Sequence, residues 1–347
     1  MRERKVISSS TNGKSSLAPG LHNIPNFDHY ISLDWSMLTM AIGHLRRRDK
    51  TPTVFERPAD LHALKEYLKT LRGSIVLTIE ETTSSHWLYI ELRDCVDRII
   101  VCDPFKNRLL NDGPKTDKID AAKLVLLLHA GLLTEVFHRD DELYDLRLLV
   151  SAYTDLVQAG VRFQNQRHAL ERGHGDATPH APFILEHLDN NIALYRQSRV
   201  AYKKKFEEFA QRNNDLRQLK DVEGIDTINA VKILSIVVDA RRFPRSGKYH
   251  NYCGLVSNGK FSGGRSYGRR KAHYCRTLKA VYKTAALSAL RGNNPVREYY
   301  ESLLAKGLAQ EDARNAIARY IATVTYGILK TGTPYDPYRW RTAAKVA

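Results

Sequence analysis

The stretch from Arg241 to Pro295 contains no aspartate or glutamate, although lysine and arginine recur throughout it. In its middle lies the triplet Ser262-Gly263-Gly264, which puts a hydroxyl nucleophile in a basic setting. Basic side chains neutralise backbone phosphates, and glycines let a backbone approach a phosphate closely. The pattern therefore predicts chemistry on phosphate groups, with nucleic acid as the first candidate.

Within this block we predict a set of residues that contact nucleic acid: Lys260, Gly263, Gly264, Arg265, Arg269, Arg270 and Lys271. Aromatic residues are interleaved with them, and aromatic faces can stack on unpaired bases. These are Tyr249, Tyr252, Phe261, Tyr267 and Tyr274. The alternatives are that the block is a solvated basic surface and that Ser262 is a turn residue.

A second group of reactive side chains is acidic. Asp117 and Asp120 stand three residues apart at the start of a predicted helix, where they share a face. Asp34 ends the first predicted strand and Glu80 ends an apolar strand, so a layered sheet could bring both to the same edge. Four converging carboxylates need divalent cations to offset their repulsion, which is typical of a magnesium or manganese site for phosphoryl transfer. Taken singly, each also fits a helix cap, an exposed helix face or a strand-end turn.

The elements that must position these acids fall in residues 27–136, where strand and helix periodicities alternate. Strands are predicted at 30–33, 38–45, 53–56, 74–79 and 98–101, and helices at 58–71, 85–95 and 115–133. Three early strands followed by alternating helix and strand predict a mixed α/β layer fold.

Residues 137–215 are predicted to form a helical arm. Apolar residues there recur at spacings of three and four, the pattern of a coiled-coil seam. They are Leu146, Leu149, Tyr153, Leu156, Phe163 and Leu170. Gly160 and Arg167 interrupt the seam, and a break at 173–182 predicts a helical hairpin. Because such arms set oligomer geometry, we expect a homodimer or homotetramer.

Residues 216–347 are predicted to form a mainly helical domain that contains the basic block. Its beginning, 219–234, resembles a helix-hairpin-helix in which Gly224 turns the chain before a helix N-terminus that can bind a phosphate. The charge of Asp226 would oppose a phosphate there. The alternative is a simple turn between two helices with Asp226 as the N-cap.

Length and charge set the broad class. The chain has 347 residues and a formal net charge of +16, which predicts a polyanionic partner. No apolar run is long enough to span a bilayer and no signal-peptide pattern occurs, so we expect a cytoplasmic protein with no membrane partner. The four cysteines lack metal-ligand spacing and are predicted to be reduced, mostly buried thiols. Residues 1–26 are predicted to be a disordered basic tail.

In type and order these features resemble the DEDD-type transposases of insertion sequences, a family of bridge-RNA-guided recombinases that includes a pilin-gene DNA invertase. The resemblance covers nearly the whole chain after the tail. It rests on Asp34, Glu80, Lys115-Thr116-Asp117-Lys118-Ile119-Asp120-Ala121, the coiled-coil middle, Phe243-Pro244, Tyr252-Cys253-Gly254-Leu255-Val256 and Ser262-Gly263-Gly264.

The resemblance implies a RuvC-like RNase H fold for residues 27–136, with Asp34, Glu80, Asp117 and Asp120 as ligands of Mg²⁺ or Mn²⁺. It implies a C-terminal transposase domain with Ser262 as the nucleophile. It also implies donor and target DNA and a guide RNA as partners. The protein would be prokaryotic and cytoplasmic, and associated with the nucleoid when bound to DNA.

Two positions depart from the family pattern. Glu80 is followed by Glu81 rather than by Thr-Gly, so Glu81 is an alternative ligand, although strand alternation favours Glu80. A Gly-Asn motif that usually follows the serine is matched only loosely by 271–273.

The block around Ser262 offers no general base. We therefore expect a metal held by the carboxylates, of the same or a neighbouring subunit, to activate its hydroxyl. A covalent serine–DNA ester would conserve the energy of the phosphodiester, in keeping with the lack of a GxxxxGK[ST] phosphate loop. Three classes stay open: a DNA recombinase, which is favoured and includes an invertase without a guide RNA; a RuvC-type junction nuclease; and a non-enzymatic nucleic-acid-binding protein.

Overall fold

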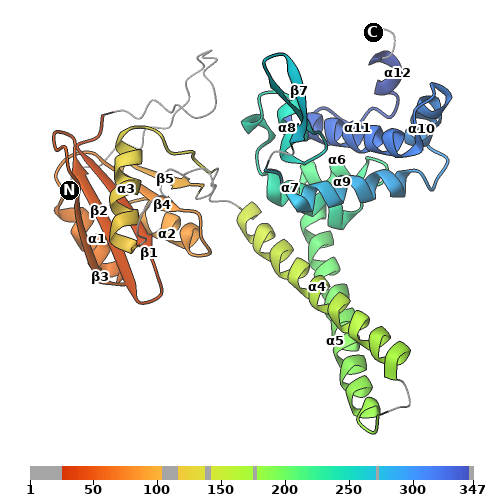
Figure 1. Ribbon diagram of the computed structural model, residues 1–347, viewed down its shortest axis with the longest axis horizontal. Helices are drawn as coiled ribbons and strands as arrows, with labels where there is room; N and C mark the ends of the chain where they lie inside the picture. The colour runs from red at the N-terminus through yellow and green to blue at the C-terminus, as the bar shows by residue number, and fades with distance from the viewer. Residues whose placement is uncertain (1–25, 104–115, 137–141, 175–177, 271–272, 344–347) are drawn as a thin grey trace. The chain divides into compact units, whose positions relative to one another are not determined.

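The computed structural model describes residues 26–103, 116–136, 142–174, 178–270 and 273–343 (Figure 1). The predicted basic tail, except for its last residue, lies outside these ranges, as does Lys271. The chain divides into two compact units, residues 1–140 and 141–347, and each is described by itself. The structure therefore groups the predicted arm with the C-terminal helices, because both contribute to one hydrophobic core.

Unit 1 is built on a five-stranded mixed sheet with the strand order β3-β2-β1-β4-β5. The strands are β1 (His29–Trp35), β2 (Thr39–Arg46), β3 (Thr53–Pro58), β4 (Ile75–Glu80) and β5 (Arg98–Cys102). β1, β2 and β3 pair antiparallel, whereas β4 pairs parallel with both β1 and β5. Every predicted strand of this segment is present, which confirms the mixed α/β fold class.

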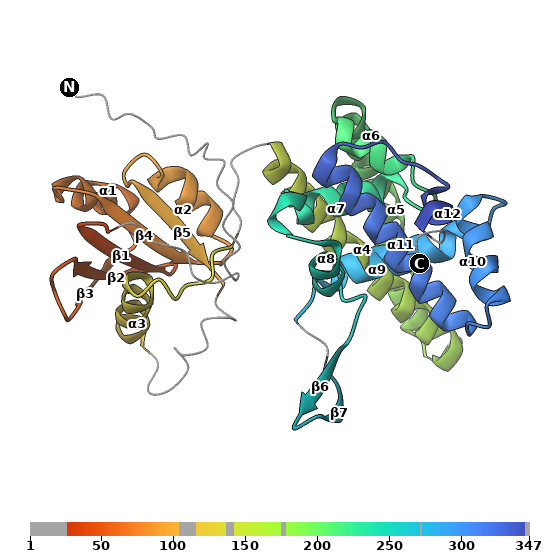
Figure 2. The ribbon, with the colours of Figure 1, turned by 90° about the horizontal axis from the view of Figure 1, so that it is seen from above.

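Helices cover both faces of this sheet, and Figure 2 shows α1 and α2 on one side and α3 on the other. Their bounds are α1 (Leu61–Thr70), α2 (Ser85–Leu92) and α3 (Asp117–His129). Ile31, Leu33 and Leu77 of the sheet pack in the core under α1 and α2. Tyr30 and Val76, one residue away in the alternation, pack against α3. Because successive side chains of a strand point to opposite faces, the sheet contributes to two hydrophobic cores, one on each face.

A chain of polar contacts ties β1, β2 and α1 together. The Nε2 atom of His29 donates to the carbonyl oxygen of Arg72 at 3.1 Å, which leaves its Nδ1 to accept from Nε2 of His44 at 2.9 Å. Nδ1 of His44 then accepts from the Tyr67 hydroxyl at 2.8 Å. The bond from Tyr67 needs an unprotonated Nδ1 on His44, so protonation of His44 breaks it. Burial, followed by the neighbouring His29 and Arg46, lowers the pKa of His44 to about 4.

The arm of unit 2 is a hairpin of two long helices, α4 (Glu142–His174) and α5 (Ala181–Arg212) (Figure 1). Tyr153 of α4 packs edge-on against Phe206 of α5, with ring centroids 5.3 Å apart. The predicted helical hairpin is therefore present. Two residues that we expected to interrupt its seam lie in the contact instead.

Gly160 is buried where the two helices touch, and a Cβ atom there would lie 2.5 Å from the ring of Tyr195. Arg167 bridges the helices with an ion pair of 2.5 Å from its Nε to Oδ1 of Asp189. The absence of a side chain at Gly160 is thus what admits the Tyr195 ring. A glycine that looked like an interruption is a close-packing position.

The rest of unit 2 is a helical body with one β-hairpin. Its elements are α6 (Asn214–Lys220), α7 (Thr227–Val237), a short 3₁₀ helix (Ala240–Arg242), α8 (Ser246–Tyr252), β6 (Asn258–Ser262), β7 (Arg265–Arg270), α9 (Arg276–Ala289), α10 (Pro295–Ala305), α11 (Gln310–Thr331) and α12 (Arg339–Ala343). Among the described helices, none is long and apolar enough to cross a lipid bilayer. The four cysteines are free, and Cys102 and Cys253 are buried, as predicted.

Replacing Gly160 with alanine should loosen the arm. The added methyl group has to displace the Tyr195 ring, and overpacking of this kind costs about 1–3 kcal/mol in the free energy of unfolding. Gly173→Ala in the same helix is the control, since a Cβ there meets no atom within 4 Å and alanine favours helix. Thermal unfolding followed by circular dichroism measures both. A midpoint for Gly160→Ala at or above that of the native protein would contradict the packing.

The histidine chain makes unit 1 sensitive to acid. Since the pKa of His44 is lowered from 6.5 to about 4, its stabilising effect is complete above pH 6.5 and declines as the pH falls towards 4. The temperature at which unit 1 unfolds should therefore decrease when the pH is lowered from 7 to 5. His44→Gln keeps a donor and an acceptor without titrating, so calorimetry of this variant should show a flatter profile. Equal slopes for the two proteins would refute the assignment.

Candidate active site

Two of the four predicted carboxylates lie at the carboxyl ends of neighbouring strands. In the parallel pairing of β1 with β4, Leu33 lies opposite Ile79, and Asp34 and Glu80 are the next residues of the two strands. Leu33 and Ile79 belong to the core under α1 and α2. By alternation, Asp34 and Glu80 therefore face the side of the sheet that α3 covers. Glu81 lies beyond the last residue of β4, in keeping with the choice of Glu80.

The other two carboxylates occupy the first turn of α3. The N-cap is Thr116, whose Oγ1 accepts the amide of Ile119 at 3.3 Å, so Asp117 is not the cap that its position alone suggested. Asp117 and Asp120 are the acidic residues of that turn. The positive end of the helix dipole favours negative charge at this place.

Contacts along α3 fix which end of the sheet its first turn meets. The Ser32 hydroxyl donates to the carbonyl oxygen of Ala121 at 2.7 Å, and the His129 ring packs against Tyr30 with centroids 4.7 Å apart. The helix therefore runs from the Asp34 end of β1 towards its beginning. Asp120 adjoins Ala121, and Asp34 lies two residues beyond Ser32, so both belong to the same corner of unit 1.

Gly43 of β2 permits this close approach. A Cβ atom there would lie 2.5 Å from Oγ of Ser32 and 2.7 Å from the carbonyl oxygen of Ala121. Ser32 and Gly43 were not predicted to be positioning residues. The available signal was the glycine inside a predicted strand, which commonly marks a close approach of another backbone.

The four carboxylates of the corner offer oxygen ligands, which suit Mg²⁺ or Mn²⁺. Its donors come from Asp34 and Glu80 on two adjacent strands and from Asp117 and Asp120 in one helical turn. Within the described ranges, no three acidic, histidine or cysteine side chains are grouped closely enough to hold a metal ion. The fold thus brings the ends of β1 and β4 and the first turn of α3 to one corner. Their carboxylates have the right chemistry for a divalent cation. The four side chains are not gathered around a common point.

Ser262 is the last residue of the strand β6, at the tip of a β-hairpin. β6 pairs antiparallel with β7, and Ser262 is opposite Arg265. The two residues between them, Gly263 and Gly264, have φ values of 55° and 75°, which a two-residue hairpin turn of type I′ requires. Figure 2 shows this hairpin extending away from the helices of its unit.

The structure describes the backbone of several predicted contact residues and not their side chains: Lys260, Ser262, Arg269 and Arg270. Gly263, Gly264 and Arg265 are exposed. A Cβ atom added at either glycine would meet nothing within 4 Å. The tip of the hairpin therefore does not pack against the rest of its unit.

The stacking role predicted for two aromatic residues of the block is wrong. Tyr249 is fully buried, contacts the Tyr282 hydroxyl and stacks on Tyr326 with centroids 5.4 Å apart. Tyr252 packs against Phe243, and the guanidinium group of Arg242 lies 4.6 and 4.9 Å from the two ring centroids. Burial raises the pKa of both tyrosines. These rings, and Arg242 with them, hold unit 2 together.

Gly224 and Asp226 also have structural roles. Gly224 has a φ of +87°, and a Cβ atom there would clash with the carbonyl oxygen of Ala285 in α9. Asp226 is the N-cap of α7 and accepts the Asn229 amide at 2.7 Å. The structure therefore shows a turn between two helices with a carboxylate cap at Asp226, and the contact of Gly224 with nucleic acid stays a prediction.

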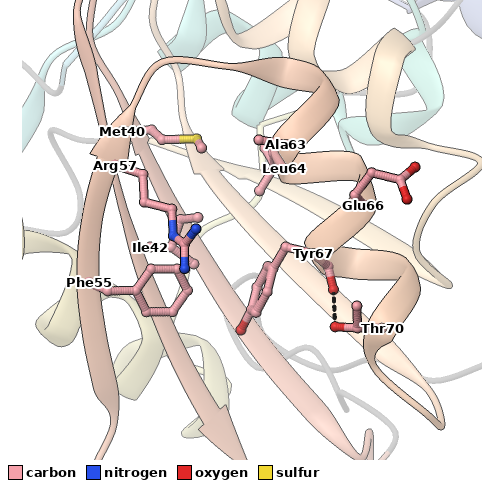
Figure 3. A pocket seen from close by; sticks show the side chains of 9 residues that line it. All are labelled: Met40, Ile42, Phe55, Arg57, Ala63, Leu64, Glu66, Tyr67 and Thr70. Carbon is pink, nitrogen blue, oxygen red and sulfur yellow. Dashed lines mark hydrogen bonds between the residues drawn. The ribbon is translucent and has the colours of Figure 1, made fainter.

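A pocket of about 270 Å³ lies in unit 1 between α1 and the strands β2 and β3 (Figure 3). Met40, Ile42, Phe55 and Leu64 form apolar parts of its wall, and Tyr67 lines it with its ring. Met40 and Ile42 belong to the core under α1 and α2, so this pocket is on the sheet face opposite α3. It is separate from the carboxylate corner.

Two protein-family models match this chain, one over residues 35–172 and one over residues 216–301. Residues 35–172 match a transposase family of the DEDD, IS110 type, and residues 216–301 match the family Transposase IS116/IS110/IS902. The first match begins at the residue after Asp34, so the prediction that Asp34 is a metal ligand is supported by its position in β1 and not by the family match. The second includes Ser262.

Two relatives carry related names. A 43.6 kDa protein of insertion element IS110 from Streptomyces coelicolor, described as uncharacterized, is 27% identical over 34% of this chain and 29% of its own length. The y4qE protein of Sinorhizobium fredii, named as a proposed transposase, is 29% identical over 48% of this chain and 45% of its own length. The match thus spans less than half of each relative. With two family matches that together cover well over half of its residues, the chain belongs to the IS110 family of DEDD-type transposases.

Proposed function

We propose that this protein is the transposase of an insertion sequence and that it cuts and rejoins DNA strands through a covalent serine–DNA intermediate. The observation that carries the proposal is the corner of unit 1 where the ends of β1 and β4 meet the first turn of α3, because each of the three contributes carboxylates. The other unit adds Ser262 at the tip of a hairpin in an acid-free stretch.

The carboxylates suit a metal-binding role. Mg²⁺ or Mn²⁺, when bound there, would offset phosphate charge in the transition state. Asp34 and Glu80 would hold it from strands buried in the sheet, and Asp117 and Asp120 from a helix fixed by the bond between Ser32 and Ala121. Because these strands and this helix are rigid, the carboxylate oxygens have to move only a short way to bind the cation.

Ser262 supplies the attacking oxygen in the proposed reaction. Its Oγ atom forms a bond to the scissile phosphorus, and the bond from phosphorus to one deoxyribose oxygen breaks. The serine hydroxyl loses a proton in this step, and the departing deoxyribose oxygen gains one. Attack by a second deoxyribose hydroxyl then releases Ser262 and restores a phosphodiester. Since the ester retains the energy of the original bond, rejoining needs no nucleotide triphosphate. Arg265, opposite Ser262 in the hairpin, would offset charge on the phosphate.

The proposed partners are donor and target DNA, a guide RNA and further copies of the chain. The net charge of +16 suits several polyanions at once. The arm supports assembly as a homodimer or homotetramer, because Phe183 and Leu194 lie on one stripe of α5 with 63% and 61% of their surface exposed. We place the protein in the prokaryotic cytoplasm, at the nucleoid when DNA is bound.

Two alternatives use the same residues differently. A RuvC-type junction nuclease would attack with water and leave Ser262 without a role. A DNA invertase would use Ser262 and the carboxylates but no guide RNA. The favoured reading rests on membership of the IS110 family together with the hairpin that carries Ser262.

Ser262→Ala should abolish protein–DNA adducts that survive denaturing electrophoresis, while DNA affinity changes less than about twofold. The variant loses the oxygen that forms the ester and keeps the basic hairpin. Ser266→Ala, on the neighbouring strand, is the matched control and should form adducts normally. Unchanged DNA cleavage by Ser262→Ala would favour the junction nuclease and reject the covalent mechanism.

Asp34→Asn and Asp120→Asn should each weaken Mn²⁺ binding by at least about 10-fold and reduce DNA cleavage, because each removes a charged ligand. Electron paramagnetic resonance of free Mn²⁺ measures binding on the intact chain without relying on activity. Asp94→Asn, an exposed acid after α2, is the control and should bind Mn²⁺ as the native protein does. Unaltered Mn²⁺ affinity in both site variants would rule out a metal site at this corner.

A further inference from the structure

Tyr267 of β7 is an exposed aromatic residue close to the turn of the serine hairpin, with 66% of its surface in contact with solvent. The other tyrosines of the acid-free stretch have partners within unit 2. Tyr249 belongs to its core, Tyr252 is partly buried against that core, and Tyr274 lies against Gly254 with Lys279 above its ring. Tyr267 is therefore the described aromatic side chain of this stretch that is left for an outside partner.

The hairpin register places Tyr267 close to the proposed nucleophile. Ser262 pairs with Arg265, and Tyr267 follows Arg265 by two residues, which is about 7 Å along a strand. Successive phosphates of one DNA strand in a duplex are separated by about 3.4 Å along its axis. The ring is thus level with a nucleotide one or two positions from a phosphate held at Ser262.

A local irregularity of β7 falls at this residue. Gly259 pairs with Arg269 and Phe261 with Ser266, so Tyr267 and Gly268 together oppose the one residue between Gly259 and Phe261. Gly268 has a φ of +97°, and a Cβ atom there would meet nothing within 4 Å. Bulges of this kind bend a strand and re-aim a side chain, and they recur next to active sites.

The charge around Tyr267 selects the kind of partner. No acid occurs from Arg241 to Pro295, and Arg265 is exposed beside it. An exposed aromatic surface in a basic stretch without acidic residues suits a nucleobase attached to phosphates, because the ring can stack on the base while basic side chains contact the backbone.

We propose that Tyr267 stacks on an unpaired DNA base one or two nucleotides from the phosphate that Ser262 attacks, and thereby positions the strand for the reaction. This inference rests on the proposed function, since it takes the hairpin to be the part that engages the scissile strand. It adds that the strand is locally unpaired at the hairpin and that an aromatic side chain holds it. Tyr267 is a positioning residue, and Ser262 keeps the chemical role.

The test uses the full chain and a DNA duplex with a short unpaired bubble that contains 2-aminopurine, whose fluorescence is quenched by stacking. The native protein should quench the probe. Tyr267→Ala should lose the quenching, weaken binding to the bubble by about 5- to 100-fold and slow adduct formation, while Tyr267→Phe should retain all three. Tyr338→Ala, which removes an exposed aromatic side chain next to α12, is the control and should quench normally.

The outcomes separate this inference from the proposed function. Ser262→Ala should quench the probe like the native protein, because stacking precedes the chemistry. Native-like quenching by Tyr267→Ala would overturn the stacking role even if Ser262 forms adducts. Loss of quenching in Tyr267→Phe as well as in Tyr267→Ala would also overturn it, since the hydroxyl would then matter. Quenching seen with an RNA bubble and not with DNA would refute the assignment to the DNA strand.

Discussion

The close contact between α3 and the sheet is the constraint on which the candidate site depends. Ser32 donates to the carbonyl oxygen of Ala121, and Gly43 leaves the space that the helix backbone occupies. A side chain at position 43 would collide with Ser32 and with the backbone of α3 and would push the helix outward. The first turn of the helix would then leave the strand ends where Asp34 and Glu80 lie.

Much of unit 1 could be predicted because its signals are local. Short strand patterns predicted β1 and β2, an apolar run predicted β4, and the acids fell at strand ends and in one helical turn. What could not be predicted was how closely α3 approaches the sheet. That approach follows from Gly43, which looks like any other glycine until the opposite backbone is known.

Unit 2 was harder to predict for physical reasons that differ from place to place. The hairpin of β6 and β7 is short and rich in glycine and arginine, so it lacks the apolar alternation that marks a strand. Tyr249 and Tyr252 stand among cations in the sequence, yet they are drawn into the core by α8 and α11. The composition shows that the stretch is basic and aromatic, whereas contacts between residues far apart in the sequence determine which aromatic rings are exposed to solvent.

The last long helix gives the assembly of unit 2 a temporal order. Lys330 of α11 donates to the carbonyl oxygen of Phe243 at 3.1 Å and to that of Pro244 at 3.0 Å, at the start of the segment that leads through α8 to the serine hairpin. Lys330 follows Phe243 by 87 residues, which a ribosome adds in roughly 4 to 17 s. In the later part of that interval, once Arg270 has been added, the hairpin already exists as sequence while the helix that fixes its base has not been completed. A nascent chain therefore carries the serine hairpin without this anchor until Lys330 has been added.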